Sequence, residues 1–251
     1  MTSNPRKGHG RRRKLIALLV LTILIAAGIL RWYHLPWDFS EWREGPPPET
    51  WSTWTRYEQI LAGEPDRPGI DYTYVPLDEI SLNLQVAVIV SEDISFFFHQ
   101  GIDWTAVREA LGEWLRGEGL RGASTITQQL AKNLFLSDKR SFTRKFREAR
   151  MARALEQQLG KQRILELYLN VIEFGDGILG VKAAALHYYG ASALGLNRDR
   201  AAGLAAAIPS PIRHNPDTRT RAWDNRKETI RGRMDQADWL RRRLGNNRDP
   251  G

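Results

Sequence analysis

Two adjacent carboxylates open the first segment whose residue types suit catalysis. Glu92 and Asp93 precede three phenylalanines and His99 in the stretch SEDISFFFHQGID. Neighbouring helix residues point about 100° apart, so the two carboxylates do not serve one ligand equally. A carboxylate beside aromatic rings is partly desolvated, which makes it a better proton acceptor near neutral pH. The alternative interpretation is a solvated acidic helix end followed by aromatic core residues.

A dense set of polar side chains follows in the stretch GASTITQQLAKN. At helical spacing Gln128 shares a face with Lys132, and Gln129 shares the adjacent row with Asn133. The N–H groups of a helix start, together with hydroxyls and a lysine, suit phosphate or sugar oxygens. Ordinary capping with a polar outer face explains the same residues. The candidate binding residues here are Ser124, Thr125, Gln128, Gln129, Lys132 and Asn133.

The third segment, SFTRKFREARMARALE, carries charges on a row that becomes apolar. Arg144, Glu148, Met151 and Leu155 fall on this row, so we expect it to face protein or a cleft, with Glu148 partly buried beside Arg144. Residues 132–163 hold ten Lys and Arg against three acids. Such a surface is either a solvated basic face or a site for a pyrophosphate or anionic lipid head groups.

The elements that must position these residues are mostly helical. Asp103 has the place of an N-cap, and Thr125 to Gln128 fit a T-x-x-Q capping box. Apolar periodicity predicts helices over 83–90, 103–117, 125–134, 141–159, 161–172, 181–189 and 199–208. We expect a short strand within 73–82, a mobile Gly-rich loop over 116–122, a turn over 173–180 and a weakly determined amphipathic C-terminal segment.

Composition and charge exclude several classes of protein. Hydrophobic residues make up 42% of the 251 residues and cysteine is absent, which excludes wholesale disorder, disulfides and cysteine-ligated zinc. The formal net charge is +8, but six of the Lys and Arg residues lie within residues 1–14. The rest of the chain holds 31 basic against 29 acidic residues, so a nucleic-acid partner loses its support.

The basic tail precedes an apolar segment. Residues 15–30 carry no charge, and Trp32, Tyr33 and Trp37 follow as an aromatic belt. We expect a membrane anchor over 15–33 with the tail in the cytoplasm; a cleaved signal peptide and a core helix are the alternatives. Residues 34–72, which are rich in Pro and Trp, predict an irregular juxtamembrane stalk with little helix.

Five segments in order resemble the motifs of the peptidoglycan glycosyltransferases, glycosyltransferase family 51. They are EDISFFFHQGID, GASTITQQLAKN, RKFREARMARALE, RILELYLNVIEFGDGILGVKAAALHYYG and LAAAIPSPIRHNP. The resemblance covers roughly residues 73–216 and implies a mainly α, lysozyme-like, two-lobed glycosyltransferase domain preceded by a single N-terminal transmembrane helix. No S-x-x-K or K-T-G sequence follows, so we expect a monofunctional member, with residues 217–251 as a basic extension.

The resemblance also implies roles for individual residues. The family joins a glycan held as undecaprenyl pyrophosphate to the 4-hydroxyl of lipid II, with inversion to a β-1,4 linkage. Glu92 matches its base and Glu148 its second acid, near the departing pyrophosphate. Lys132, Arg144 and Lys145 match its pyrophosphate-binding cations. Asp93 and His99 are interpreted as structural, and the residues that match the cleft wall and turn are Tyr168, Asn170, Phe174, Gly175 and Gly180.

The same resemblance sets the expected cofactors, partners and place of action. No covalent cofactor is expected; a divalent cation, Mg²⁺ or Mn²⁺, is allowed, but the sequence assigns it no ligands. The partners are lipid II, the nascent glycan chain, membrane lipids and, as an open option, other cell-wall synthesis or division proteins. The catalytic domain is expected on the periplasmic side of the inner membrane. Two rival functions remain: a lysozyme-type peptidoglycan-cleaving enzyme and a non-catalytic membrane-anchored scaffold.

Overall fold

The computed structural model describes residues 7–34, 36–49, 51–64, 69–118, 122–136 and 141–245. The chain divides into two compact units, Met1–Trp37 and Asp38–Gly251. Residues 1–6 of the predicted tail and 246–251 of the predicted extension lie outside the described residues, as do parts of the predicted stalk and Gly-rich loop.

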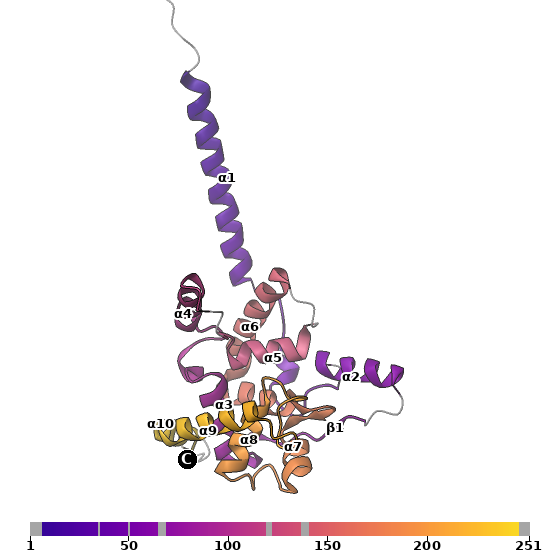
Figure 1. The fold of residues 1–251 in the computed structure, drawn as a ribbon. Coiled ribbons are helices and arrows are strands. Elements are labelled where there is room, and N and C mark those ends of the chain that lie inside the picture. Colours follow the sequence, from indigo (N-terminus) through magenta and orange to yellow (C-terminus); the bar gives the residue numbers. More distant parts are fainter. Residues whose placement is uncertain are drawn as a thin grey trace, which may run out of the picture. The chain divides into compact units, whose positions relative to one another are not determined.

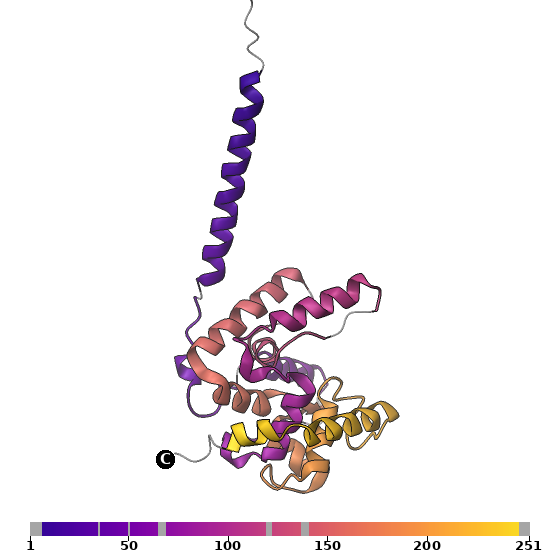
Figure 2. The ribbon, with the colours of Figure 1, turned by 90° about the vertical axis from the view of Figure 1, so that its left-hand side faces the viewer.

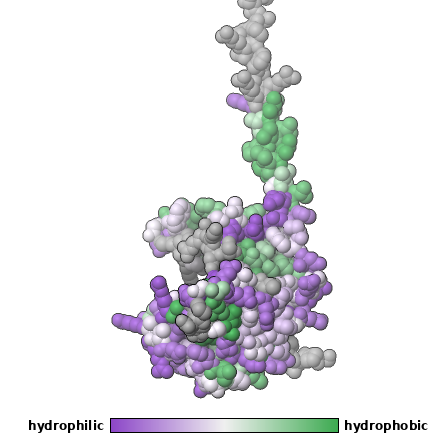
Figure 3. Space-filling view, turned by 90° about the vertical axis from the view of Figure 1, so that its right-hand side faces the viewer, coloured by the Kyte–Doolittle hydropathy of each residue, from purple (hydrophilic) through white to green (hydrophobic). Residues whose placement is uncertain are grey.

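The first unit contains one long helix, α1, Lys7–Tyr33. Its stretch Lys14–Trp32 has a mean hydropathy of 2.4 and none of it is buried, and Figure 3 shows it as a hydrophobic column. Nineteen residues span about 28 Å, close to the hydrocarbon thickness of a bilayer. Length and composition therefore suit a membrane anchor or a signal sequence. The helix begins at Lys7, within the predicted tail.

The second unit is mainly α, as predicted (Figure 1). Its described helices are α2 Ser52–Gly63, α3 Leu82–Glu92, α4 Trp104–Leu115, α5 Ile126–Phe135, α6 Phe142–Val171, α7 Gly180–Tyr189, α8 Arg198–Ala207, α9 Arg221–Asp235 and α10 Asp238–Gly245. Three short 3-10 helices lie at Ser40–Trp42, Leu77–Glu79 and Phe96–Phe98, and three short strands are β1 Asp71–Tyr72, β2 Glu173–Gly175 and β3 Ile178–Leu179.

Helix α3 lies at the centre of this unit. Ser81 caps its start by accepting a hydrogen bond from the Asn83 N–H at 3.2 Å, and every residue from Leu84 to Val90 is buried. It packs against α8 and α9. Because α8 is rich in alanine, the two backbones approach closely. The helix runs to Glu92, two residues beyond the predicted end, so the predicted base is held at the end of a fully packed helix.

Helices α5 and α6 lie side by side (Figure 2). The predicted capping box is confirmed: Thr125 accepts from the Gln128 N–H at 3.1 Å, and the Gln128 side chain accepts from the Thr125 N–H at 3.0 Å. The two helices predicted over 141–159 and 161–172 are the two segments of α6, which are separated at Gly160, whose φ of 73° and ψ of 166° are not helical. Such a positive φ is readily adopted only by glycine.

The expectation of little helix in the stalk is wrong, because Ser52–Gly63 forms α2. Trp51 is buried, with its ring 5.1 Å from that of Tyr72. At the start of α2, Ser52 Oγ donates to the Leu136 carbonyl at 2.7 Å and Thr53 Oγ1 donates to the Asn133 carbonyl at 3.2 Å. The Pro-rich composition predicted extended chain, but aromatic packing and these bonds to the end of α5 fix a helix.

The three strands form a small sheet in the order β1–β3–β2, with β1 parallel and β2 antiparallel to β3. The turn predicted over 173–180 is the β2–β3 hairpin. The strand predicted within 73–82 lies earlier, at Asp71–Tyr72. Beyond it, Asn170 clamps the backbone of Val75: its amide accepts from the Val75 N–H at 2.9 Å and donates to the Val75 carbonyl at 2.8 Å.

At Gly180, next to the hairpin, the backbone lies close to the backbone of Asn170. Gly180 has φ +79°, and a Cβ there would lie 2.5 Å from the Asn170 carbonyl oxygen. Gly190, at the other end of α7, has φ +57° and open space around its Cβ position. Gly180→Ala is expected to lower the free energy of unfolding by about 2–5 kcal/mol, and Gly190→Ala by about 1–2 kcal/mol. Chemical denaturation of both variants measures the difference, and equal losses would contradict this role of the close contact.

The predicted C-terminal extension contains α9 and α10, which pack on α3 and α8. Trp223 Nε1 donates to the Gly203 carbonyl of α8 at 2.8 Å. Arg233 donates to the Val90 carbonyl of α3 at 3.2 Å. The extension therefore belongs to the same compact unit as the helices that carry the candidate site.

Candidate active site

Glu92 is held through both oxygens of its carboxylate. Gln129 Nε2 of α5 donates to Oε2 at 2.9 Å, and Arg226 Nη2 of α9 donates to Oε1 at 2.7 Å. Ser91 Oγ also donates to Oε1, at 3.3 Å. The Glu92 side chain is 10% exposed. Each carboxylate oxygen has two lone pairs, so this fixed carboxylate retains the capacity to accept a proton.

Tyr168 of α6 fixes the orientation of Gln129. Its hydroxyl donates to Gln129 Oε1 at 2.9 Å, which turns the amide NH₂ group towards Glu92. Burial raises the pKa of Tyr168 well above its usual value, so the hydroxyl stays protonated and remains a donor. The resemblance placed Tyr168 in the cleft wall; its contact is with the amide that holds Glu92.

Asp93 and His99 make structural contacts, in agreement with their interpretation from sequence. Asp93 is buried, accepts from the Ile126 N–H at 3.0 Å and lies 3.0 Å from His99 Nε2. The first of these bonds satisfies an N–H group at the start of α5. The Gly101 N–H donates to His99 Nδ1 at 3.2 Å, so the pair ties the end of α3 to two loops.

Thr125 and Gln128 are buried in the capping box, although both were candidate binding residues. Thr125 Oγ1 also donates to the Gly101 carbonyl at 2.7 Å. With their side chains engaged by backbone groups, these two residues position α5. The more accessible polar positions of this segment are the half-buried Ser124, Gln129 and Asn133 and the exposed Lys132.

Glu148 is surrounded by the predicted cations of its own helix. It is 3% exposed, accepts from Arg144 Nη1 at 3.2 Å, and forms a second ion pair with Lys145. Lys145 Nζ also donates to Ser124 Oγ at 2.9 Å. Met151 is buried further along the row, so the prediction that this row faces protein is confirmed. Four candidate residues, Ser124, Arg144, Lys145 and Glu148, thus form one cluster.

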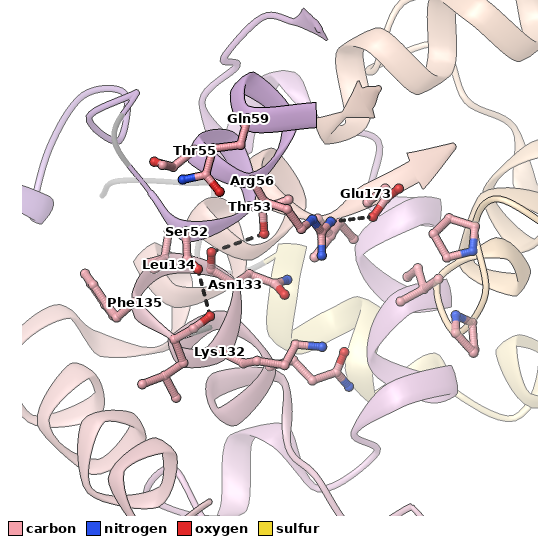
Figure 4. A pocket seen from close by; sticks show the side chains of 16 residues that line it. Ser52, Thr53, Thr55, Arg56, Gln59, Lys132, Asn133, Leu134, Phe135 and Glu173 are labelled. Atoms are coloured by element: carbon pink, nitrogen blue, oxygen red, sulfur yellow. Dashed lines mark hydrogen bonds and ion pairs between the residues drawn. The ribbon is translucent and has the colours of Figure 1, made fainter. Parts of the chain in front are cut away.

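A cavity of about 650 Å³ brings Gln129, Lys132 and Asn133 of α5 together with one face of α2 (Figure 4). Gln129 lines this cavity and donates a hydrogen bond to Glu92, so it connects the cavity to that carboxylate. The Glu148 cluster is not part of the cavity lining. The remaining lining residues are Ser52, Thr53, Thr55, Arg56, Gln59, Leu134, Phe135, Leu136, Ile172, Glu173, Ile208, Pro209 and Pro211.

Sequence reasoning missed the polar wall that α2 and β2 give to this cavity. Arg56 Nη2 donates to Glu173 Oε2 at 3.1 Å, and the hydroxyl of Tyr57 donates to the other oxygen of Glu173. Burial raises the pKa of Glu173, and these two hydrogen bonds oppose the rise. The partners are more than a hundred residues apart, so no local spacing pointed to them.

The second omission is Arg226, which was assigned only to the basic C-terminal segment. The sequence did contain a signal for the place of Arg226. At helical spacing the apolar residues Trp223, Ile230 and Met234 form one stripe of α9, and all three are buried. Arg226 and Arg233 flank this stripe at helical spacing. An arginine beside the buried stripe of an amphipathic helix faces neighbouring protein rather than bulk water.

The described residues of the site do not form a cage of protein ligands for a divalent cation. Within the described ranges, no group of three or more His, Cys, Asp and Glu side chains is arranged to hold a metal ion. Glu148, the acid that the resemblance places near the pyrophosphate, is already engaged by Arg144 and Lys145.

Comparison with known proteins identifies the family to which the chain is similar. Residues 64–235, more than half of the chain, match the family described as Transglycosylase. A relative from Marinomonas sp. (strain MWYL1) is 48% identical over 174 residues, covering 68% of this chain and 77% of its own. Relatives from Shewanella amazonensis and Methylobacillus flagellatus are 40% and 39% identical, covering 92% and 90% of this chain and 84% and 96% of theirs. All three are described as biosynthetic peptidoglycan transglycosylases.

Proposed function

Since the chain belongs to the transglycosylase family, whose members are peptidoglycan glycosyltransferases of cell-wall synthesis, we propose that it polymerises lipid II into β-1,4-linked glycan strands. The donor is the growing glycan, carried as an undecaprenyl pyrophosphate, and the acceptor is lipid II. The observation that carries the proposal is the buried carboxylate of Glu92, held by Gln129 at the edge of a polar cavity that also presents Lys132.

In this proposal Glu92 is the general base. It takes the proton of the acceptor 4-hydroxyl while that oxygen forms a bond to C1 of the donor sugar. The bond from C1 to the pyrophosphate oxygen breaks, and the leaving group departs with the electron pair. A single displacement of this kind inverts the configuration from α to β. General base catalysis contributes about 10²–10⁴-fold in rate.

The departing pyrophosphate needs fixed positive charge rather than a proton. Arg144 and Lys145 supply it in the proposal, and Lys132 adds a third cation from α5. Glu148 keeps the first two cations aimed by pairing with both. The Lys145 ammonium donates to the Ser124 hydroxyl and forms an ion pair with Glu148, so both side chains hold it in place.

The apolar stretch Lys14–Trp32 is proposed to anchor the enzyme in the inner membrane beside its lipid-linked substrate and the surrounding membrane lipids. The basic residues before it place the N-terminus in the cytoplasm by the positive-inside rule. The catalytic unit then lies on the periplasmic side. Other proteins of cell-wall synthesis or division are proposed partners there.

The test of function is incubation of the full-length, detergent-solubilised protein with purified lipid II. We expect glycan strands that grow with time and release of undecaprenyl pyrophosphate. Intact sacculi incubated with the same protein should keep their glycan length. Shortened sacculi with no polymer from lipid II would contradict the proposal and support the lysozyme-type rival.

Lys132→Ala tests the cation that lines the cavity. Losing one charge-assisted hydrogen bond, worth about 1.5–3 kcal/mol, should raise the apparent KM for lipid II about 10- to 100-fold. Lys182→Ala is the matched control, since Lys182 is an exposed lysine on α7 outside the cavity lining. Steady-state polymerisation over a range of lipid II concentrations measures both variants. Equal KM values for the two would remove Lys132 from the binding site.

A further inference from the structure

Arg226 is the one contact of Glu92 that comes from the C-terminal helix α9. Its Nη2 lies 2.7 Å from Glu92 Oε1, and its side chain is 36% exposed, against 10% for Glu92. The other two donors to this carboxylate, Gln129 and Ser91, are neutral. Within the described residues, the positive charge that Glu92 contacts directly is therefore that of Arg226.

The position of Arg226 is set by the docking of α9. Trp223, one turn earlier, is bonded to the Gly203 carbonyl, and Arg233, two turns later, is bonded to the Val90 carbonyl. In the described residues, Arg226 Nε is buried without a hydrogen-bond partner. Among the described residues, the side-chain hydrogen bond of Arg226 is the one that its Nη2 donates to Glu92.

Negative charge accumulates around the end of α3. Glu92 is followed by the buried Asp93, and both act electrostatically on Tyr168 together with Arg226. Asp93 has its own partners in His99 and the Ile126 N–H. A partly buried carboxylate that loses the cation it contacts pays a larger cost of desolvation, which favours a move of the side chain towards water.

We propose that Arg226 is a positioning residue of the reaction: it holds the Glu92 carboxylate in a fixed orientation, so that the acceptor hydroxyl meets a correctly aimed base. The inference rests on the proposed function, in which Glu92 is that base. It extends the functional unit beyond residues 73–216 into the C-terminal helix. The guanidinium does not transfer the proton; it acts through the carboxylate that does.

The competing explanation is that Arg226 merely docks α9 on α3. Arg233 provides the matched control, because it lies on the same side of the same helix and bonds α3 through a backbone carbonyl rather than through Glu92. If docking were the only role, Arg226→Gln and Arg233→Gln would have similar effects. If Arg226 positions the base, only its replacement should slow the chemical step.

The experiment compares Arg226→Gln, Arg226→Lys, Arg233→Gln and Glu92→Gln in the full-length protein with purified lipid II. We expect Arg226→Gln to lower kcat about 10- to 100-fold, the loss of one hydrogen bond to a charged group, with KM changed less than about twofold. Arg226→Lys, which keeps the charge but not the shape of the guanidinium, should recover part of that loss and leave kcat measurably below that of the unchanged protein. Arg233→Gln should keep kcat near that of the unchanged protein.

Thermal unfolding of the same variants separates the two explanations. Equal kcat values and equal melting temperatures for Arg226→Gln and Arg233→Gln overturn the inference, as does an Arg226→Lys variant no better than Arg226→Gln. Should Arg226→Gln fail to fold, the Lys variant decides: full stability with lowered kcat supports positioning, and unchanged kcat refutes it. Failure of the unchanged protein to polymerise lipid II would refute the proposed function, and an active Glu92→Gln variant would refute Glu92 as the base on which the inference rests. Inactive Glu92→Gln with normal Arg226→Gln refutes only the role of Arg226.

Discussion

Glu92→Gln is expected to lower the rate of lipid II polymerisation about 10²–10⁴-fold while the protein still binds its substrate. The new amide has nearly the shape of the carboxylate but accepts no proton at neutral pH. Its NH₂ group must face either Arg226 or the NH₂ of Gln129, and both are donors. Turning Gln129 does not help, because its Oε1 already accepts from Tyr168.

This donor conflict has a second measurable effect. One poorly paired buried donor should lower the free energy of unfolding by about 1–3 kcal/mol. Polymer formation, lipid II binding and thermal unfolding are therefore measured together. Glu109→Gln is the matched control, since it removes one exposed carboxylate from α4. A Glu92→Gln protein with unchanged turnover would remove Glu92 as the base, and full biological activity of Glu92→Gln and Glu148→Gln variants would favour the scaffold rival.

Glu148→Gln is expected to lower kcat about 10- to 100-fold through the two cations that it holds. A neutral amide cannot balance Arg144 and Lys145 together, so the guanidinium and the ammonium move apart and stabilise the departing pyrophosphate less well. The Lys145 side chain is 48% exposed, so water can solvate its ammonium group when Glu148 is replaced. The substitution should therefore lower kcat more than it lowers the free energy of unfolding.

A double-mutant cycle tests whether Glu148 acts through Lys145. Glu148→Gln, Lys145→Ala and the double variant are assayed with lipid II, and the interaction free energy is calculated from kcat. Side chains in one network couple by about 0.5–3 kcal/mol, so the double variant should lose much less than the two single losses combined. Strictly additive losses would show that Glu148 contributes independently of this cation.

Local signals in the sequence predicted the parts of the fold that local interactions decide. The N-cap at Asp103 is confirmed by hydrogen bonds of 2.9 Å from two N–H groups, and the capping box at Thr125 is confirmed as well. The apolar row through Met151 correctly predicted that Glu148 is buried. In each case the interacting residues lie within about one or two helical turns, so their spacing alone was informative.

The features that the sequence did not predict depend on residues far apart in the chain. Helix α2 was read as irregular from its composition, but Trp51 packs on Tyr72, and Thr53 bonds the end of α5. Arg226 meets Glu92 across 134 residues. Spacing in one dimension carries no information about such contacts, and helix propensity is too weak a guide where tertiary packing decides.

The contact between Glu92 and Arg226 also determines when, during synthesis of the chain, the site can form. Translation delivers α1 and Glu92 early and α9 late, so a nascent chain carries its key carboxylate long before it carries the cation that holds it. The site becomes competent only when the last helices have been made and have docked on α3. A chain terminated before residue 226 should therefore be inert towards lipid II.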